Sequence, residues 1–173
     1  MATLPRPSAD DAAPYYFTYI DQVPAGDVFA VLEGGVAETR RLLGGLEPER
    51  EHHRYAPGKW TVREVLGHVI DAERVFGYRA FHIGRGDRAP LPGMEPDDYA
   101  ATAGAGRRPA AELLDELDVL RRGHLAFFAG LDAEAWERAG TASGVTFRVR
   151  ALPFILAGHE IHHRRILAER YLR

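Results

Sequence analysis

Apolar residues recur at intervals of three and four in four segments of the chain, the spacing that gathers them on one face of an α-helix. These segments predict helices over residues 27–44, 61–83, 109–131 and 153–171. Strand-like alternation is limited to a short stretch from Val145 to Val149, and a helical turn is expected around Trp136. The pattern therefore predicts an all-α fold, a four-helix bundle whose apolar faces meet in a shared core.

The second predicted helix has the clearest start. Thr61 and Glu64 match the capping box, in which each side chain accepts from the backbone N–H at the other's position. Trp60 directly before the cap completes the signal as one half of a hydrophobic staple. The first predicted helix is weaker, because Gly34 and Gly35 each cost roughly 1 kcal/mol relative to alanine.

The segments outside the helices are expected to have different roles. Residues 1–24 combine prolines with the aromatic run 15–19 and predict an irregular arm that docks its rings on the bundle. Residues 84–108 predict a loop rich in glycine and proline between the second and third helices. Its length of about 25 residues exceeds the usual connection and indicates a functional cover or a crossover. A chain of 173 residues is expected to form one domain, residues 1–173.

The composition narrows the chemistry. The chain has no cysteine, which excludes cysteine nucleophiles, cysteine-ligated zinc and iron–sulfur clusters, and agrees with a reducing, cytoplasmic location. A net charge of -3 gives no general attraction to nucleic acid. No run of about 18 apolar residues occurs, so no membrane span is expected.

The strongest candidate site lies in the last predicted helix. His159 and His163 are four residues apart, so both imidazoles project from one face and reach a single metal ion. They continue an apolar stripe that includes Leu156 and Ile166, which favours His163 over the neighbouring His162 as the second ligand. The alternative is that the two are core histidines with backbone or water partners.

The same residues spell H-E-x-x-H, the zincin protease signature, with Glu160 in the position of the general base. The extended form of that signature needs a glycine and a histidine where this chain has Ile166 and Glu169. The sequence therefore disfavours a protease, and a third metal ligand is expected upstream of the pair.

Two upstream histidines qualify equally by periodicity. His68 lies at the border of the apolar face of the second helix, and His124 lies on the apolar stripe of the third. His52 and His53 fall in a charged segment, and His82 falls near a helix end, which makes these three weaker candidates. The pattern alone does not separate His68 from His124.

Two segments resemble the DinB/YfiT-like family of four-helix-bundle metalloenzymes: YAPGKWTVREVLGHVIDAER at residues 55–74 and GHEIHH at residues 158–163. The resemblance extends from about residue 15 to the end and includes residues 91–94 and Tyr99 in the long loop. It implies a metal triad of His68, His159 and His163 that holds a divalent ion such as nickel, zinc or iron. On this basis His124 becomes a core residue or a neighbour of the ligands.

The resemblance also implies a range of activities. Some members resemble thiol-dependent S-transferases that use bacillithiol, mycothiol or glutathione, and others are hydrolases. Three imidazoles leave a coordination position open, as in a catalytic site. Since the chain has no cysteine, the thiol would be a cosubstrate. We expect a metal-dependent thiol S-transferase acting on a small molecule, with metal-assisted hydrolysis or a non-catalytic, stress-associated metal-binding bundle as alternatives.

Four charged residues near the candidate ligands are expected to lie outside the site. Asp71 and Glu160 are in reach of ligand N–H groups, but surface positions are expected for both. Arg74 and Arg79 could bind the carboxylates of a low-molecular-weight thiol, but an exposed, solvated face explains both equally well, and neither is placed in the site. A homodimer is expected because two-fold dimers are the commonest assemblies.

Overall fold

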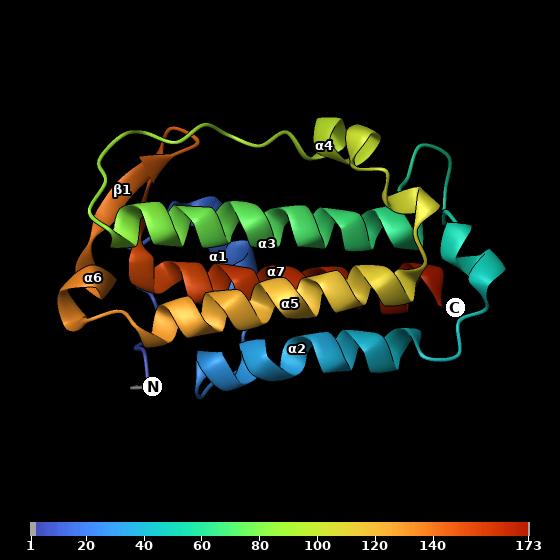
Figure 1. The fold of residues 1–173 in the computed structure, drawn as a ribbon, viewed down its shortest axis with the longest axis horizontal. Helices are drawn as coiled ribbons and strands as arrows, with labels where there is room; N and C mark the ends of the chain where they lie inside the picture. The colour runs from blue at the N-terminus through green and yellow to red at the C-terminus, as the bar shows by residue number, and fades with distance from the viewer. Residues whose placement is uncertain (1–2, 173) are drawn as a thin grey trace.

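The computed structural model describes residues 3–172, and Met1, Ala2 and Arg173 lie outside the described part (Figure 1). Its long helices are α2 (Val28–Leu43), α3 (Val62–Gly84), α5 (Ala110–Ala129) and α7 (Leu152–Ile166). The four helices run side by side along the long axis of the molecule (Figure 1). The predicted all-α four-helix bundle is confirmed.

The helices that follow one another in sequence are not always neighbours in space. Both α3 and α2 pack against α5 and α7, so α2 and α3 occupy opposite corners of the bundle. The capping box of α3 forms as the sequence predicts, with Glu64 N–H donating to Thr61 Oγ1 at 3.1 Å and Thr61 N–H donating to Glu64 at 2.7 Å. The last helix continues past Ile166 as a π-helical turn, Leu167–Tyr171.

Buried apolar residues form two clusters, one toward each end of the bundle. Along α2, one cluster holds Leu32 and the other holds Val36. Along α5, Leu117 and Phe128 belong to different clusters, and the fully buried Arg121 lies between them. A layer of buried polar side chains therefore crosses the middle of the bundle.

The segment predicted as a loop over residues 84–108 contains a helix, α4 (Pro96–Ala103), followed by a 3-10 turn, Ala105–Arg107. The prediction of an irregular loop was wrong for this part. Pro96 opens α4 and Gly104 ends it at a φ of 67°, but α4 buries none of its residues and so carries no apolar stripe. It packs on α3, as Figure 1 shows.

A small hairpin closes one end of the bundle. Strands β1 (Ala139–Ala142) and β2 (Val145–Arg148) pair antiparallel, and helix α6 (Ala133–Glu137) precedes them. The extended segment and the helical turn around Trp136 were predicted, but β1 was not. Ser143 and Gly144 turn the chain with φ values of 53° and 73°, the geometry of a tight hairpin. The long segment before α4 joins the hairpin through Leu91, which exchanges backbone hydrogen bonds with Thr141 and Ser143.

The arm predicted as irregular contains a 3-10 turn, Pro14–Tyr16, and a short helix, α1 (Phe17–Ile20). Helix α1 packs directly on α7. A Cβ atom at Gly158 would lie only 2.1 Å from the backbone oxygen of Tyr19, so glycine is required for this approach. The contact holds the Tyr19 side chain against the histidines of α7. Within residues 3–172, no helix combines the length and apolar character needed to cross a membrane.

Candidate metal centre

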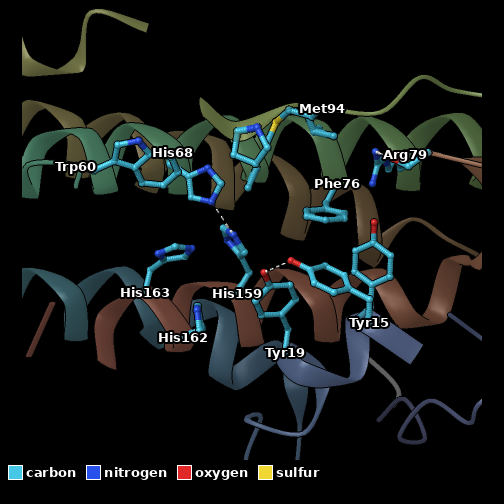
Figure 2. A pocket seen from close by; sticks show the side chains of 15 residues that line it. Tyr15, Tyr19, Trp60, His68, Phe76, Arg79, Met94, His159, His162 and His163 are labelled. Atoms are coloured by element: carbon cyan, nitrogen blue, oxygen red, sulfur yellow. Dashed lines mark hydrogen bonds between the residues drawn. The ribbon is translucent and has the colours of Figure 1, made fainter. Parts of the chain in front are cut away.

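Three buried histidines meet where α3 packs against α7. His68 comes from α3, and His159 and His163 come from successive turns of α7. Their ring centroids are separated by 4.9 Å (68–159), 4.8 Å (68–163) and 4.5 Å (159–163). Figure 2 shows the rings turned toward the same space between the two helices. The structure thus brings together the three residues that the family resemblance implies.

The geometry of these rings suits one divalent ion. One nitrogen from each ring lies within 4.8 Å of the others. An ion that binds nitrogen at about 2.0–2.1 Å in tetrahedral geometry holds its nitrogens roughly 3.4 Å apart, so the group would close by up to about 1.4 Å around an ion. The Nε2 atoms of His68 and His159 are already 3.0 Å apart.

Hydrogen bonding leaves this group incompletely satisfied. Nδ1 of His68 is buried and has no hydrogen-bond partner among residues 3–172. A buried nitrogen without a partner costs on the order of 1–3 kcal/mol. The hydrogen-bonding capacity of the His68 ring is therefore not satisfied by the neighbouring protein groups, which agrees with a site that takes a ligand.

Burial lowers the pKa of all three imidazoles. It brings the pKa of His68 to about 4, although the charge of Asp97 acts in the opposite direction. Burial and the neighbouring His68 and His162 bring the pKa of His163 to about 3. Enclosure and the other histidines hold the pKa of His159 well below its ordinary value. All three rings are neutral at pH 7, the state in which an imidazole binds a metal.

His162 lies beside the triad but is not part of it. The amide nitrogen of Gln22 donates to its Nδ1 at 3.3 Å. The ring of Tyr19 packs edge-on against both His159 and His162, with centroids 5.2 Å and 5.5 Å away. Burial and the hydrogen bond with Tyr15 raise the pKa of Tyr19, so its phenol stays protonated. Sequence analysis missed Tyr19 as a site residue, and its only signal was the aromatic run in the arm.

A cleft of about 240 Å³ opens beside the histidines. One wall is α3, from Trp60 before its first turn to Arg79, and the opposite wall combines α7 with the tyrosines of the N-terminal arm (Figure 2). Met94, before α4, and Pro96, its first residue, line the cleft from a third side. The long connection therefore contributes to the lining of the cleft, and its role as a functional cover stays a prediction.

Arg79 was left outside the site, with an exposed face and a carboxylate contact as equal alternatives, and the exposed face was wrong. The residue is only 3% exposed and lines the cleft. Its guanidinium lies over the ring of Phe76 at 5.0 Å and donates to the Ser143 hydroxyl at 2.7 Å. The hairpin that carries Ser143 covers this end of α3, which the helical periodicity of α3 alone does not reveal. Arg74 is exposed and pairs with Glu116, as an outward-facing residue does.

Behind the triad, Arg121 bridges two buried carboxylates. It donates to both oxygens of Glu73 at 2.9 Å and to Glu160 at 2.9 Å. Thr39 donates to the other oxygen of Glu160 at 2.7 Å, and His124 donates to Glu73 at 3.0 Å. Arg121 follows Leu117, and Glu73 follows Val69, by four residues. A charged residue at a position of the apolar helix face was the sequence signal that could have identified Arg121 and Glu73 as buried.

This network corrects the expectation for Glu160, which is 3% exposed rather than at the surface. Asp71 is half-buried, and neither carboxylate is hydrogen-bonded to a histidine of the triad within residues 3–172. His124 serves the polar layer and not the triad. The weaker candidates also lie elsewhere, since His52 and His53 are exposed and His82 bonds the Ala89 carbonyl.

The Glu73–Arg121 pair predicts an acid-sensitive part of the stability. Burial alone would raise the pKa of Glu73, but the charge of Arg121 and the bonds from His124 and Arg121 outweigh it and hold the pKa at about 2, below its ordinary 4.5. A lowered folded-state pKa stabilises the fold fully above pH 4.5, and this contribution disappears as the pH falls from 4.5 toward 2. It amounts to something on the order of 3 kcal/mol.

Urea unfolding of Glu73→Gln between pH 6 and pH 3.5 should therefore show a weaker fall in the free energy of unfolding than the parent protein. Glu134→Gln is the matched control, because the Glu134 side chain is 80% exposed. It should follow the parent protein. Equal pH slopes in the parent protein and Glu73→Gln would contradict the assignment.

Comparisons with known proteins agree with the resemblance seen in the sequence. The sequence pattern of the DinB superfamily matches residues 32–167, more than half of the chain. The structure of YfiT from Bacillus subtilis superposes with a TM-score of 0.71 at 18% identity, over 83% of this chain and 85% of that chain. YfiT is described as a probable metal-dependent hydrolase with an unusual four-helix bundle topology.

A second similar structure is that of the mycothiol-dependent maleylpyruvate isomerase, with a TM-score of 0.65 at 14% identity. The match covers 83% of this chain but only 61% of that one, so this chain spans less than two thirds of the isomerase. At these identities both structures establish a shared fold. No curated protein matches the chain.

Proposed function

The chain belongs to the DinB superfamily, and on that premise we propose that it is a metal-dependent enzyme in which His68, His159 and His163 hold one divalent ion. The observation that supports this most directly is the meeting of three buried, neutral imidazoles on the wall of a cleft. Nitrogen ligands suit nickel, zinc and iron alike, so the donor set fits all three. An ion held there would lower the pKa of a thiol or a water molecule and make it a nucleophile near neutral pH.

The residues of the chain prepare the site for such chemistry. Burial keeps the imidazoles neutral, so their lone pairs stay available without competition from protons at pH 7. The tyrosines of the arm and Met94 add apolar surface to the lining of the cleft beside the histidines. Tyr19, whose phenol stays protonated and is hydrogen-bonded to the Tyr15 hydroxyl at 2.9 Å, lines the cleft beside His159.

For the reaction itself we propose thiol S-transfer, with a low-molecular-weight thiol such as mycothiol, bacillithiol or glutathione as cosubstrate. The chain has no cysteine, so the thiol has to be supplied from outside. The shared fold with a mycothiol-dependent isomerase supports this choice. Metal-assisted hydrolysis of a small substrate is the second candidate, supported by the description of YfiT.

The test has two parts, metal analysis of freshly purified protein and assays of electrophile consumption with and without thiol. We expect about one divalent ion per chain, and turnover that needs both the thiol and His159. Thiol-independent cleavage of esters or amides that is lost in His159→Ala would favour the hydrolase instead. If the ion is present and stabilises the protein but no activity on either panel depends on His159, a structural ion is the better interpretation.

The proposal includes a cytoplasmic homodimer that acts on a small molecule and does not bind nucleic acid. The absence of cysteine and the net charge of -3 support the location and the lack of nucleic-acid binding. Light scattering of the purified protein tests the dimer, and a mobility shift that persists at physiological salt would contradict the last point.

A further inference from the structure

Arg79 is a buried cation without a counter-ion. It is 3% exposed, yet it forms no ion pair within the part of the chain that is described. Its Nη2 donates to two neutral acceptors, the Ser143 hydroxyl at 2.7 Å and the Pro92 carbonyl at 3.4 Å. Buried charges in proteins are normally paired, because an unpaired one is costly to remove from water. The charge of Arg79 is therefore oriented by its neighbours but not neutralised.

The contacts of Arg79 leave donors free for a ligand. Its Cζ lies 5.0 Å from the ring centre of Phe76 and 5.3 Å from that of Phe147, which are cation–π distances. A guanidinium has five N–H donors at its edge, while stacking engages its faces. No hydrogen bond within residues 3–172 uses Nε or Nη1. Each of these nitrogens can donate a charge-assisted hydrogen bond to a carboxylate oxygen.

Arg79 and the histidines face the same cleft from opposite ends. It follows His68 by eleven residues on α3, which is about three helical turns and places both on one face about 16 Å apart along the axis. The rings of Tyr16 and Phe76 lie in the cleft lining between the two ends, and Figure 2 shows Phe76 between the triad and Arg79. No aspartate or glutamate belongs to the described lining. The cleft thus suits an elongated molecule with an apolar middle and an anionic end.

We propose that Arg79 binds a carboxylate of the substrate, so that the apolar middle of the molecule lies on Phe76 and its reacting group reaches the histidines. The identification of this ligand as a substrate rests on the proposed function. The binding of a carboxylate at Arg79 does not, because the guanidinium and its two free nitrogens need no ion. Arg79 is then the residue that selects acids over neutral analogues.

A purely structural role is the alternative, in which Arg79 only fastens the hairpin to α3 through Ser143. The test compares 4-phenylbutyrate with its neutral amide, 4-phenylbutyramide, by titration calorimetry on the protein as purified. We expect the acid to bind at least about tenfold more tightly than the amide, because a charge-assisted hydrogen bond is stronger than a neutral one. Equal affinity for the two probes would overturn the proposal.

The variant Arg79→Gln is expected to lose this preference for the acid. Arg85→Gln is the matched control, since Arg85 lies on the exposed end of the same helix and its guanidinium also packs over two phenylalanine rings. It should bind both probes as the parent protein does. Retention of the acid preference in Arg79→Gln would overturn the proposal.

If Arg79→Gln does not fold, the proposal can still be tested on the parent protein. The ¹⁵N resonance of Arg79 Nε–H should shift on addition of the acid and stay unchanged with the amide, and an unchanged resonance with both would overturn the proposal. Binding that is lost in His159→Ala but kept in Arg79→Gln would place the carboxylate at the triad, against this proposal but not against the proposed function. If the purified protein contains no metal but still binds the acid through Arg79, the inference about Arg79 is supported and the proposed metal-dependent function is contradicted.

Discussion

Arg121→Met is expected to lower the free energy of unfolding by about 3–5 kcal/mol. The change leaves the carboxylates of Glu73 and Glu160 in the core without their shared counter-charge, and it also removes the bond from Arg121 to the Leu32 carbonyl at 2.8 Å. Removing one partner of a buried ion network costs more than the network contributes, because the remaining charges stay away from water. Urea unfolding at pH 7, followed by circular dichroism, measures the loss.

Arg122→Met is the control for this experiment. Arg122 is the next residue on α5, its side chain is 68% exposed, and it pairs with Asp118 one turn away. Exposed pairs of this kind contribute little, so the free energy of unfolding should change by no more than about 0.5 kcal/mol. Similar losses in the two variants would show that Arg121 does not hold the bundle together in the way described.

The polar layer also bears on the candidate site, although it does not touch the triad. Glu160 directly follows His159 on α7, and its bonds with Arg121 and Thr39 fix the rotation of that helix. The rotation of α7 in turn determines where His159 and His163 point. Arg121→Met should therefore weaken metal binding as well as stability, because it removes a bond to Glu160 that fixes the rotation of α7.

The bounds of the four long helices follow from local sequence. Predicted residues 61–83 became Val62–Gly84, since the capping box and the apolar stripe act within a few residues of each other. Helix α4 was not predicted, because it buries none of its residues and its sequence shows no apolar face. The sequence signals that remain there, Pro96 and Gly104, mark its ends but not its helical character.

Contacts between distant segments explain what the sequence did not reveal. Gly35 was read as a weakness of its helix, but a Cβ atom there would lie 2.6 Å from a carboxylate oxygen of Glu160, 125 residues further along the chain. A surface position was expected for Glu160 and considered for Arg79, because charged residues are rarely buried unless they have partners. The groups that accompany them come from other helices and from the hairpin, which helical periodicity does not identify.

The candidate site was also predictable from the sequence only in part. Periodicity alone indicated that His159 and His163 share a face of one helix, and it left His68 and His124 equal as the third ligand. The family resemblance favoured His68, and the structure brings His68 to the pair while His124 bonds Glu73. The choice depends on how α3 and α5 are rotated in the bundle, which is set by tertiary packing.

Metal binding should be lost in His163→Ala and kept in His162→Ala. The two residues are adjacent and of the same type, but only His163 belongs to the buried group of three, while His162 is half-buried and bonds Gln22. Even residues that only support a ligand cost about 10–100-fold in metal affinity when they are changed, so the loss of a ligand should exceed that range. Competition with a chromogenic chelator measures the affinity.

Thermal melts give a second readout of the same pair of variants. A chelator should lower the melting temperature of the parent protein and of His162→Ala, because an ion that binds only the folded state stabilises it. It should have no effect on His163→Ala, which has no ion to lose. The opposite pattern would move the ligand from His163 to His162 and would require α7 to be rotated away from α3. Since Glu160 fixes that rotation through Arg121, such a result would contradict the packing of the bundle as well as the assignment of the site.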